Sequence, residues 1–320
     1  MTSQLRARQV ISHNGFVDEP QAYLNGRFLP LGQATIAVND TGFVLGASVT
    51  EQLRTFRGRL FHLDDHLRRL QHSLDIVGIQ PAETAQQMAQ IAERLVQTNF
   101  ALVDPSDDLG LSIFVTPGPN ATLNDGDGGP ACLGMHTYRL PFCLWADKYD
   151  SGQALIVTDV QQTPSQCWPR ELKCRSRMHY FLADRAAAAA DPGARAILCD
   201  ASGHVLEATT ANLIAYYKAE GFVTPPHEQV LPGISWSSLL QIADRLGLPF
   251  SERPLLPQDV AAADEVMLSS TPFCLLPVTR WNRAAMGDGQ PGPIFRRLIE
   301  AWSELVNVDI IGQARQFAQR

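Results

Sequence analysis

Lysine is scarce in this sequence, because only three of its 26 lysines and arginines are lysines. Lys148 and Lys218 lie in polar, turn-like segments, where a solvated side chain is the usual outcome. Lys173 is different because it lies in Glu171–Leu182, where an extended segment gives way to an alanine-rich stretch. Chemistry that needs a lysine amine is therefore expected at Lys173.

The surroundings of Lys173 predict a reactive amine. The alanine-rich stretch should form a helix that begins near Met178, and a helix start carries partial positive charge. That charge, together with Arg175 and Arg177, is expected to lower the pKa of Lys173 and make it more nucleophilic. An ordinary solvated lysine at a helix end is the alternative that the same residues allow.

Length and composition indicate a soluble, two-domain globular protein. The chain has 320 residues, of which 45% are hydrophobic and 18% charged. It has no apolar run of about 18 residues that could span a membrane, and the N-terminus lacks an apolar signal core. A cytoplasmic location is therefore expected by default. The net charge of −7, without a basic stripe, argues against nucleic acid as a partner.

The six cysteines are scattered and form no Cys-x-x-Cys pair. Most lie in apolar surroundings, which favours buried, reduced thiols over disulfides or a zinc site. No metal is therefore expected. These residues are Cys132, Cys143, Cys167, Cys174, Cys199 and Cys274.

The first half of the chain predicts hairpins and two helices. Residues 1–20 show little periodicity and are expected to form a loose arm. Asn25–Gly26 and Arg57–Gly58 each separate two apolar runs and predict tight turns. The loop at 118–130, rich in Gly, Asn and Asp, either covers a site or is an ordinary surface loop. Further expected elements are a strand at 34–38, a helix capped by Asp64 with Arg69 beside its buried stripe, a helix from Pro81 to about Asn99, and strands at 109–116 and 131–140.

The pattern pauses at 141–150, which we take as a linker between domains at 1–140 and 151–320. Short strands with interspersed helices in both halves indicate a mixed α+β fold, not a doubly wound parallel sheet. The second half predicts helices at 178–190, from Ile234 to about Leu246 and from Pro293, with strands at 154–160, 195–199, from Val205, from Ala211, and at 221–224, 265–269 and 274–279.

Several short motifs occur in an order that resembles one family. That family is the class IV aminotransferases, the fold-type IV pyridoxal-phosphate enzymes, which include branched-chain and D-amino-acid aminotransferases and aminodeoxychorismate lyase. The resemblance covers roughly residues 22 to 305. It implies a homodimer with the cofactor between two domains, and a loop at 118–130 that closes over the neighbouring subunit's site. The motifs are Asp40–Gly46, Phe61–Leu70, Leu172–Lys173, Gly203–Asn212, Thr224–Pro225, Leu231–Ile234 and Ser269–Thr271.

The resemblance assigns roles to individual residues. Lys173 would hold pyridoxal phosphate covalently and then move a proton at Cα of the substrate. Glu207 would pair with the pyridine nitrogen and keep the ring an electron sink, whereas a salt-bridged strand carboxylate is the structural alternative. Asn212 would brace the site. The implied phosphate ligands are Arg69, Ile234, Ser235, Ser270 and Thr271, although Ser235 and Thr271 could equally cap a helix or turn.

The sequence also departs from the family pattern. Met178 stands where branched-chain enzymes carry a tyrosine near the cofactor's phenolic oxygen, and Tyr180 is expected to face elsewhere on the helix. Trp236 stands where the family usually has arginine. Thr50 stands where branched-chain enzymes place an aromatic pocket wall.

Substrate recognition is the least defined part. Pro117 stands where D-amino-acid enzymes use an arginine, and this disfavours that subtype. Arg54 and Arg139 are candidate carboxylate partners, or exposed strand arginines. Phe142 resembles the family's aromatic pocket wall.

The sequence therefore predicts a pyridoxal-phosphate-dependent aminotransferase that moves an amino group between an amino acid and a 2-oxo acid. A branched-chain type is expected if the substrate is apolar. A lyase of the aminodeoxychorismate type could use the same Lys173. The third alternative is a cofactor-binding homologue without turnover, against which the presence of both Lys173 and Glu207 argues.

Overall fold

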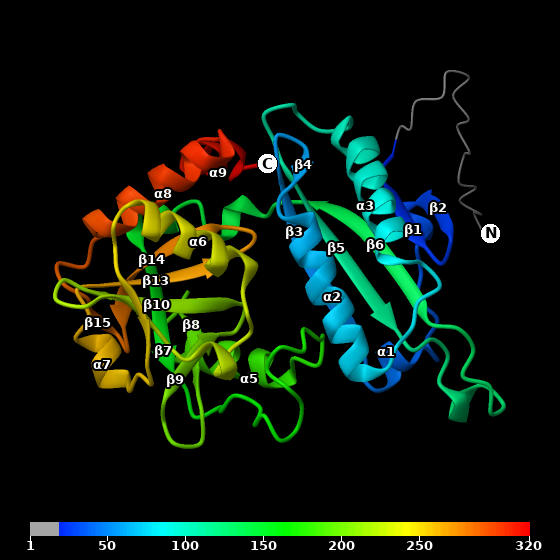
Figure 1. The fold of residues 1–320 in the computed structure, drawn as a ribbon, viewed down its shortest axis with the longest axis horizontal. Coiled ribbons are helices and arrows are strands. Elements are labelled where there is room, and N and C mark those ends of the chain that lie inside the picture. The colour runs from blue at the N-terminus through cyan, green and yellow to red at the C-terminus, as the bar shows by residue number, and fades with distance from the viewer. Residues whose placement is uncertain (1–18) are drawn as a thin grey trace, which may run out of the picture.

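The computed structural model describes residues 19–320, so the loose arm expected over residues 1–20 lies almost entirely outside the described residues. Two sheets, one from each half of the chain, stand side by side (Figure 1). The segment at 141–150, where a linker is predicted, lies in the sequence between the last strand of the first sheet and the first strand of the second. It contains the 3-10 turn Phe142–Leu144 and the short helix α4, Lys148–Ser151. The prediction of a mixed fold of helices and sheets is confirmed.

The first sheet is antiparallel, with six strands in the order β2-β1-β6-β5-β3-β4. Helices α2 and α3 pack on it and bury side chains such as Leu70 and Leu95 against Leu53 and Leu111. The elements are β1 Gln21–Leu24, β2 Arg27–Pro30, α1 Thr41–Val44, β3 Val49–Phe56, β4 Arg59–Leu60, α2 Leu63–Val77, α3 Ala85–Phe100, β5 Leu109–Thr116 and β6 Cys132–Arg139.

Local sequence explains the turns of this sheet. Asn25 and Gly26 adopt φ values of 46° and 82°, and Arg57 and Gly58 adopt 53° and 71°. Positive φ at both central positions is what a tight hairpin turn requires, so both hairpins are confirmed.

The start of α2 differs from the prediction. The helix begins at Leu63, directly after His62 in a left-handed conformation, and no side chain caps it. Asp64 was expected to be the cap, which is wrong. It lies inside the first turn with Asp65, where negative charge favours the helix start. Helix α3 begins later than predicted, because Thr84 and Gln87 form a capping box just before Ala85.

The strand predicted at 34–38 is also wrong. Its alternation of apolar and polar residues matches a strand, but no backbone among residues 19–320 pairs with it. Ile36 is 40% exposed and Val38 is 82% exposed, so the apolar side chains of the segment face outward.

The second sheet is mixed, with nine strands. Strand β9 pairs with β8 and also with β10, so β10, β13, β14, β7, β8 and β9 form a closed ring. The strands are β7 Gln153–Val157, β8 Arg195–Cys199, β9 Val205–Ala208, β10 Ala211–Tyr217, β11 Gly221–Thr224, β12 Phe250–Glu252, β13 Glu265–Ser270, β14 Cys274–Trp281 and β15 Ala284–Ala285.

Helices cover this sheet on different sides (Figure 1). Helix α5 packs Ala183 and Ala187 on β8, whereas α8 packs Leu298 and Trp302 into the main core. No helix within residues 19–320 combines the length and the apolar character that crossing a membrane requires. The helices of this half after α4 are α5 Met178–Ala190, α6 Ile234–Arg245, α7 Pro257–Ala261, α8 Pro293–Val306 and α9 Ile310–Phe317.

All six cysteines are free thiols. The prediction that they are buried is right for Cys132, Cys199 and Cys274 and wrong for Cys143 and Cys167, which are exposed.

Candidate active site

Lys173 lies in the wall of a cavity of about 730 Å³ that both halves of the chain line. Gln52, Arg69 and Tyr138 come from the first half, and most of the remaining lining residues come from the second half. The cavity therefore depends on how the two halves are packed together.

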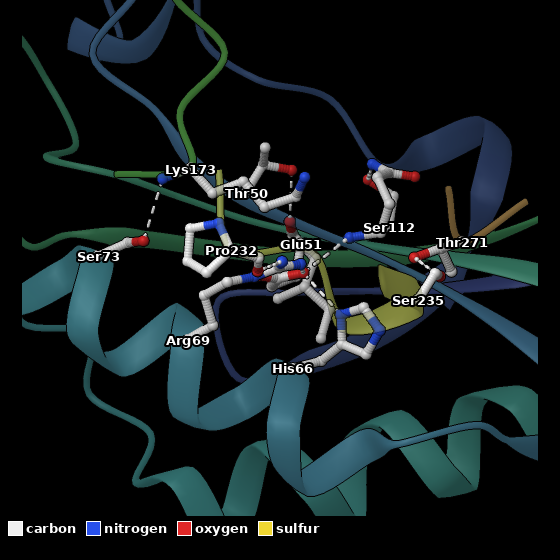
Figure 2. Close-up of polar contacts among 12 residues, drawn as sticks. Thr50, Glu51, His66, Arg69, Ser73, Ser112, Lys173, Pro232, Ser235 and Thr271 are labelled. Carbon is white, nitrogen blue, oxygen red and sulfur yellow. Dashed lines mark hydrogen bonds and ion pairs between the residues drawn. The ribbon is translucent and has the colours of Figure 1, made fainter. Parts of the chain in front are cut away.

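The backbone of Lys173 is fixed by the first half of the chain. Its N–H donates to the hydroxyl of Ser73 on α2 at 3.2 Å, and its carbonyl accepts from the N–H of Thr50 on β3 at 3.0 Å (Figure 2). The next residues continue this contact, because Cys174 forms a β-bridge with Val49. The lysine is thus presented by a segment docked between β3 and α2.

The side chain of Lys173 is half-buried, and no hydrogen bond or ion pair within residues 19–320 reaches its Nζ. Burial, followed by the positive charge of Arg69, lowers the pKa of Lys173 to about 7. The predicted direction is confirmed, but its main cause differs from the prediction. Helix α5 begins only at Met178, and Arg177 contributes less than burial.

Glu207 on β9 lines the same cavity and is 5% exposed. Its Oε1 accepts from Nε2 of Gln162 at 2.6 Å and from the hydroxyl of Tyr180 at 3.0 Å. Its Oε2 has one long contact, 3.4 Å from the N–H of Leu231. Burial raises the pKa of Glu207, and the hydrogen bond from Tyr180 opposes that rise. Within the described chain no cation forms a salt bridge with it, so the salt-bridge alternative is not what the structure shows.

Tyr180 is a cavity residue that the sequence did not identify. It points in a different direction on α5 from Met178, as expected, but that direction is toward the cavity. Met178 is 71% exposed. Gln162 was missed as well, because it precedes the lysine motif in a segment without regular structure.

Arg69 on α2 also lines the cavity. Its Nε and one terminal nitrogen bind both carboxylate oxygens of Glu51 at 2.7 and 2.8 Å, and the other terminal nitrogen donates to the carbonyl of Pro232 at 2.7 Å (Figure 2). His66 also contacts Glu51, at 2.7 Å. Burial raises the pKa of Glu51, but Arg69 and His66 outweigh burial and hold that pKa well below its usual range. The sequence identified Arg69 but not the buried Glu51 that holds it.

The start of α6 lies beside Arg69. Gly233 precedes the helix, and no side chain caps its first turn. The hydroxyls of Ser235 and Thr271 lie 3.4 Å apart on the cavity wall, and Ile234 lines it too. An uncapped helix start next to a guanidinium and two hydroxyls has the chemistry of an anion site. Asn212 braces the approach by donating to the carbonyl of Leu231 at 2.9 Å.

Ser270 differs from the other expected anion ligands. Its hydroxyl donates to the carbonyl of Thr210 at 2.8 Å and so joins the end of β13 to the turn between β9 and β10, both of which line the cavity. Two other hydroxyls, those of Thr209 and Ser269, are buried in the cavity lining without a hydrogen-bond partner among residues 19–320.

The structure does not bring the four predicted substrate residues to this cavity. Arg54 is 1% exposed, and its guanidinium donates to the carbonyl of Pro272 at 2.9 Å and to Oε1 of Gln313 at 3.0 Å. It is neither an exposed strand arginine nor a lining residue, because the second half of the chain covers that face of β3.

The other three predicted substrate residues, Thr50, Phe142 and Arg139, also lie away from this cavity. The hydroxyl of Thr50 donates to the carbonyl of Ile113 inside the first sheet. Phe142 is 1% exposed and packs against Trp145. Arg139 lines a different cavity, on the first sheet.

Three arginines that line the main cavity have no carboxylate partner. Within residues 19–320, no acidic side chain lies within salt-bridge distance of Arg170, Arg177 or Arg195. The terminal nitrogens of Arg177 have no partner in these residues, since its one hydrogen bond runs from Nε to the carbonyl of Cys174. Lys148, by contrast, pairs with Asp147. The cavity therefore holds uncompensated positive charge, in a chain whose net charge is −7.

This donor set fits pyridoxal phosphate. A half-buried amine with a lowered pKa suits bonding to an aldehyde, and a buried carboxylate suits pairing with a pyridine N–H. Arg69, Ser235, Thr271 and the start of α6 suit a phosphate group.

Known proteins agree with this chemistry. The family model described as amino-transferase class IV matches residues 48–281. D-alanine aminotransferase of Bacillus licheniformis is 26% identical over 275 residues, which cover 86% of this chain and 93% of that protein. Branched-chain-amino-acid aminotransferase-like protein 2 of Arabidopsis thaliana is 26% identical over 290 residues, which cover 89% of this chain and 50% of that protein.

Solved structures share the fold. The branched-chain amino acid aminotransferase of Escherichia coli superposes with a TM-score of 0.82 at 20% identity, covering 90% of this chain and 95% of that one. A branched-chain amino acid aminotransferase of T.th. with pyridoxamine 5′-phosphate gives 0.80 at 21% identity, with 93% and 96% covered. Because the family model spans most of the chain and the same motifs converge on one cavity, this chain belongs to the class IV aminotransferases, the pyridoxal-phosphate-dependent transaminases.

Proposed function

We propose that this class IV aminotransferase moves an amino group between an apolar amino acid of the branched-chain type and a 2-oxo acid. The observation that carries the proposal is the free amine of Lys173 in a cavity with Glu207 in one part and the Arg69 anion site in another. A reaction that uses an amine, a ring nitrogen and a phosphate together accounts for all three groups.

The proposal gives each residue one task. When bound, the cofactor supplies an aldehyde for the amine and a ring that takes up an electron pair. Lys173 holds the cofactor and then carries a proton to and from Cα of the substrate. Glu207 accepts a hydrogen bond from the ring nitrogen. Arg69, Ser235, Thr271 and the backbone at Ile234 bind the phosphate, whereas Ser270 and Asn212 brace the turns around it.

We assign the substrate carboxylate to Arg177. Arg177 lines the same cavity as Lys173, and its charge contributes to the lowered pKa of Lys173. Its terminal N–H groups suit two-point binding of a carboxylate. Trp168, Leu172 and Phe273 provide an apolar wall, which favours an apolar side chain.

The names of the relatives divide between D-alanine and branched-chain substrates. Pro117 stands where the resemblance places an arginine in D-amino-acid enzymes, and this disfavours the D-amino-acid subtype. The cofactor-loaded protein should be mixed with a panel of L- and D-amino acids while the absorption of the bound cofactor is followed. We expect the largest response from L-leucine, L-isoleucine and L-valine, and none from Lys173→Ala.

Three outcomes would contradict the proposal. A response confined to D-amino acids would overturn the branched-chain type. Release of pyruvate from aminodeoxychorismate, without transfer to a 2-oxo acid, would indicate a lyase. If the protein takes up pyridoxal phosphate but no amino acid changes the absorption of the bound cofactor, the protein would be a homologue without turnover.

We also propose that the protein is a homodimer. Each subunit would have two domains, at 1–140 and 151–320. Support comes from large apolar side chains that are exposed in the segment before β3, because exposed apolar surface often marks an interface. Val38, Phe43 and Leu45 are 82%, 74% and 68% exposed. Analytical ultracentrifugation should give twice the chain mass, and Phe43→Ser should shift the equilibrium toward the monomer. The cytoplasmic location stays a prediction.

A further inference from the structure

We propose that Gln162 and Tyr180 are positioning residues that keep the Glu207 carboxylate ionised and turn one of its oxygens toward the cofactor's ring nitrogen. This inference rests on the proposed function, because it assumes that Glu207 meets a pyridine N–H. It concerns two side chains that belong to none of the motifs by which the family was recognised.

The contacts of Glu207 are unequal at its two oxygens. Oε1 accepts from Gln162 at 2.6 Å and from Tyr180 at 3.0 Å, which uses both of its lone pairs. Oε2 receives only the N–H of Leu231 at 3.4 Å. Oε2 is therefore the oxygen that can accept a further, short hydrogen bond from a group in the cavity.

The orientation of the Gln162 amide follows from its other partners. Its Oε1 accepts from the N–H of Thr163 at 2.9 Å and lies 2.9 Å from Nε2 of His179. With the oxygen engaged on that side, the NH₂ group must point to Glu207. Gln162 is 5% exposed, and its own N–H donates to the carbonyl of Cys199, so the side chain starts from a fixed backbone.

Tyr180 is suited to remain a donor. Burial and the negative charge of Glu207 raise the pKa of Tyr180 well above its usual value, so its hydroxyl keeps its proton. Burial raises the pKa of Glu207 too, and the Tyr180 hydrogen bond acts against that rise. Glu207 has no salt-bridge partner among residues 19–320, so its hydrogen-bond donors there are neutral, and the more distant charges of Arg170 and Lys173 also favour its ionised form. A protonated Glu207 would be a poorer acceptor for a pyridinium N–H.

A chemical comparison separates this role from simple packing. The cofactor-free protein is titrated with pyridoxamine 5′-phosphate, which has no aldehyde and binds without a covalent bond. The second probe is the same molecule with the ring nitrogen replaced by C–H. Both probes are measured by calorimetry on Tyr180→Phe, Gln162→Leu and the unmodified protein. The matched control is Tyr217→Phe, because the Tyr217 hydroxyl donates to the carbonyl of Asp259 away from the cavity.

We expect Tyr180→Phe and Gln162→Leu each to weaken binding of pyridoxamine 5′-phosphate roughly tenfold. A protonated or misaligned Glu207 would no longer accept the charge-assisted hydrogen bond from the ring nitrogen. Binding of the analogue without the ring nitrogen should change less than about twofold, because that analogue makes no hydrogen bond to Glu207. Tyr217→Phe should alter neither. If Gln162→Leu does not fold, Tyr180→Phe alone decides.

Two outcomes would overturn the inference. Equal losses for both probes would show that the side chains only pack the site, and unchanged binding of both would show that they do not act on Glu207. If the unmodified protein does not bind pyridoxamine 5′-phosphate, that result would instead contradict the proposed function.

Discussion

At the scale of single residues, the Arg69 guanidinium depends on Glu51, a side chain with 0% exposure. Glu51 binds Arg69 through both oxygens and also contacts His66. A buried charge without its partner is costly. Removing either Glu51 or Arg69 alone should therefore destabilise the fold strongly.

Replacing Glu51 should therefore be far more harmful than replacing an exposed ion-pair partner. Glu51→Ala is expected to lower the free energy of unfolding by about 3–5 kcal/mol. Glu220→Ala, which breaks an exposed pair with Arg253, should have a much smaller effect on the free energy of unfolding, because water screens that pair. Urea denaturation monitored by circular dichroism measures both, and similar losses for the two variants would refute the argument.

The pH dependence of cofactor uptake follows from Lys173. Only the neutral amine attacks an aldehyde, and a pKa of about 7 makes Lys173 mostly neutral above that pH. The rate at which cofactor-free protein takes up pyridoxal phosphate should rise as pH increases through about 7 and then level off. Stopped-flow absorption between pH 5.5 and 9.5 gives this profile. A rate that still rises tenfold per pH unit at pH 9 would mean that the pKa is not lowered.

At the scale of elements, the start of α6 depends on a glycine. A Cβ on Gly233 would lie 2.0 Å from Oδ1 of Asn212, so a larger residue must displace either the helix start or the asparagine. The close approach of Asn212 to the 231–233 loop explains why this position has no side chain.

Gly233→Ala should disturb the proposed phosphate site. We expect at least a roughly tenfold loss of affinity for pyridoxamine 5′-phosphate, because a misplaced N–H or hydroxyl loses a charge-assisted hydrogen bond. Gly32→Ala is the matched control, since a Cβ there has no neighbour within 4 Å and φ is not positive. Unchanged affinity in Gly233→Ala would show that the helix start does not bind the phosphate.

Sequence patterns predicted the regular elements well where periodicity was strong. Strand β5, helix α5 and strand β8 have the predicted bounds, whereas the short β12 and α7 and the final helix α9 were missed. Short elements carry too few residues for a period to show. The strand at 34–38 was wrong because alternation cannot reveal whether a pairing partner exists.

The candidate site was predicted only in part for the same reason, because a sequence pattern does not show which distant residues come into contact. Motif order placed Lys173 and Glu207 in one cavity, since both belong to contiguous segments of the family pattern. Glu51, Gln162 and Tyr180 were missed because their contacts join residues 15 to 45 positions apart. Burial of Arg54 could not be foreseen, because a strand pattern does not say what covers a face.

At the scale of the whole molecule, a buried polar network joins the two halves. Gln313 on the C-terminal helix α9 accepts from Arg54 on β3 at 3.0 Å and donates to Asp108 at 2.8 Å. Arg54 also donates to Pro272, in the turn beside Thr271. The end of the chain thus stabilises both the packing of the halves and a cavity wall.

Gln313→Leu should destabilise the protein by about 2–4 kcal/mol, because it leaves buried charged groups with fewer partners. Gln316→Leu on the same helix, where the residue is exposed, should change stability by less than about 0.5 kcal/mol. Thermal unfolding of both variants tests this, and equal midpoints would contradict it.

The docking of Lys173 on Ser73 and Thr50 means that the nucleophile comes from one half of the polypeptide while its position is set by the other. A chimaera that kept residues 141–320 but took its front portion from a relative would retain every atom of the lysine, yet inherit foreign acceptor and donor groups beneath it. Reactivity in such hybrids should therefore follow the source of residues 1–140, which also supply Arg69, so recombination within 141–150 would change rates without altering Lys173.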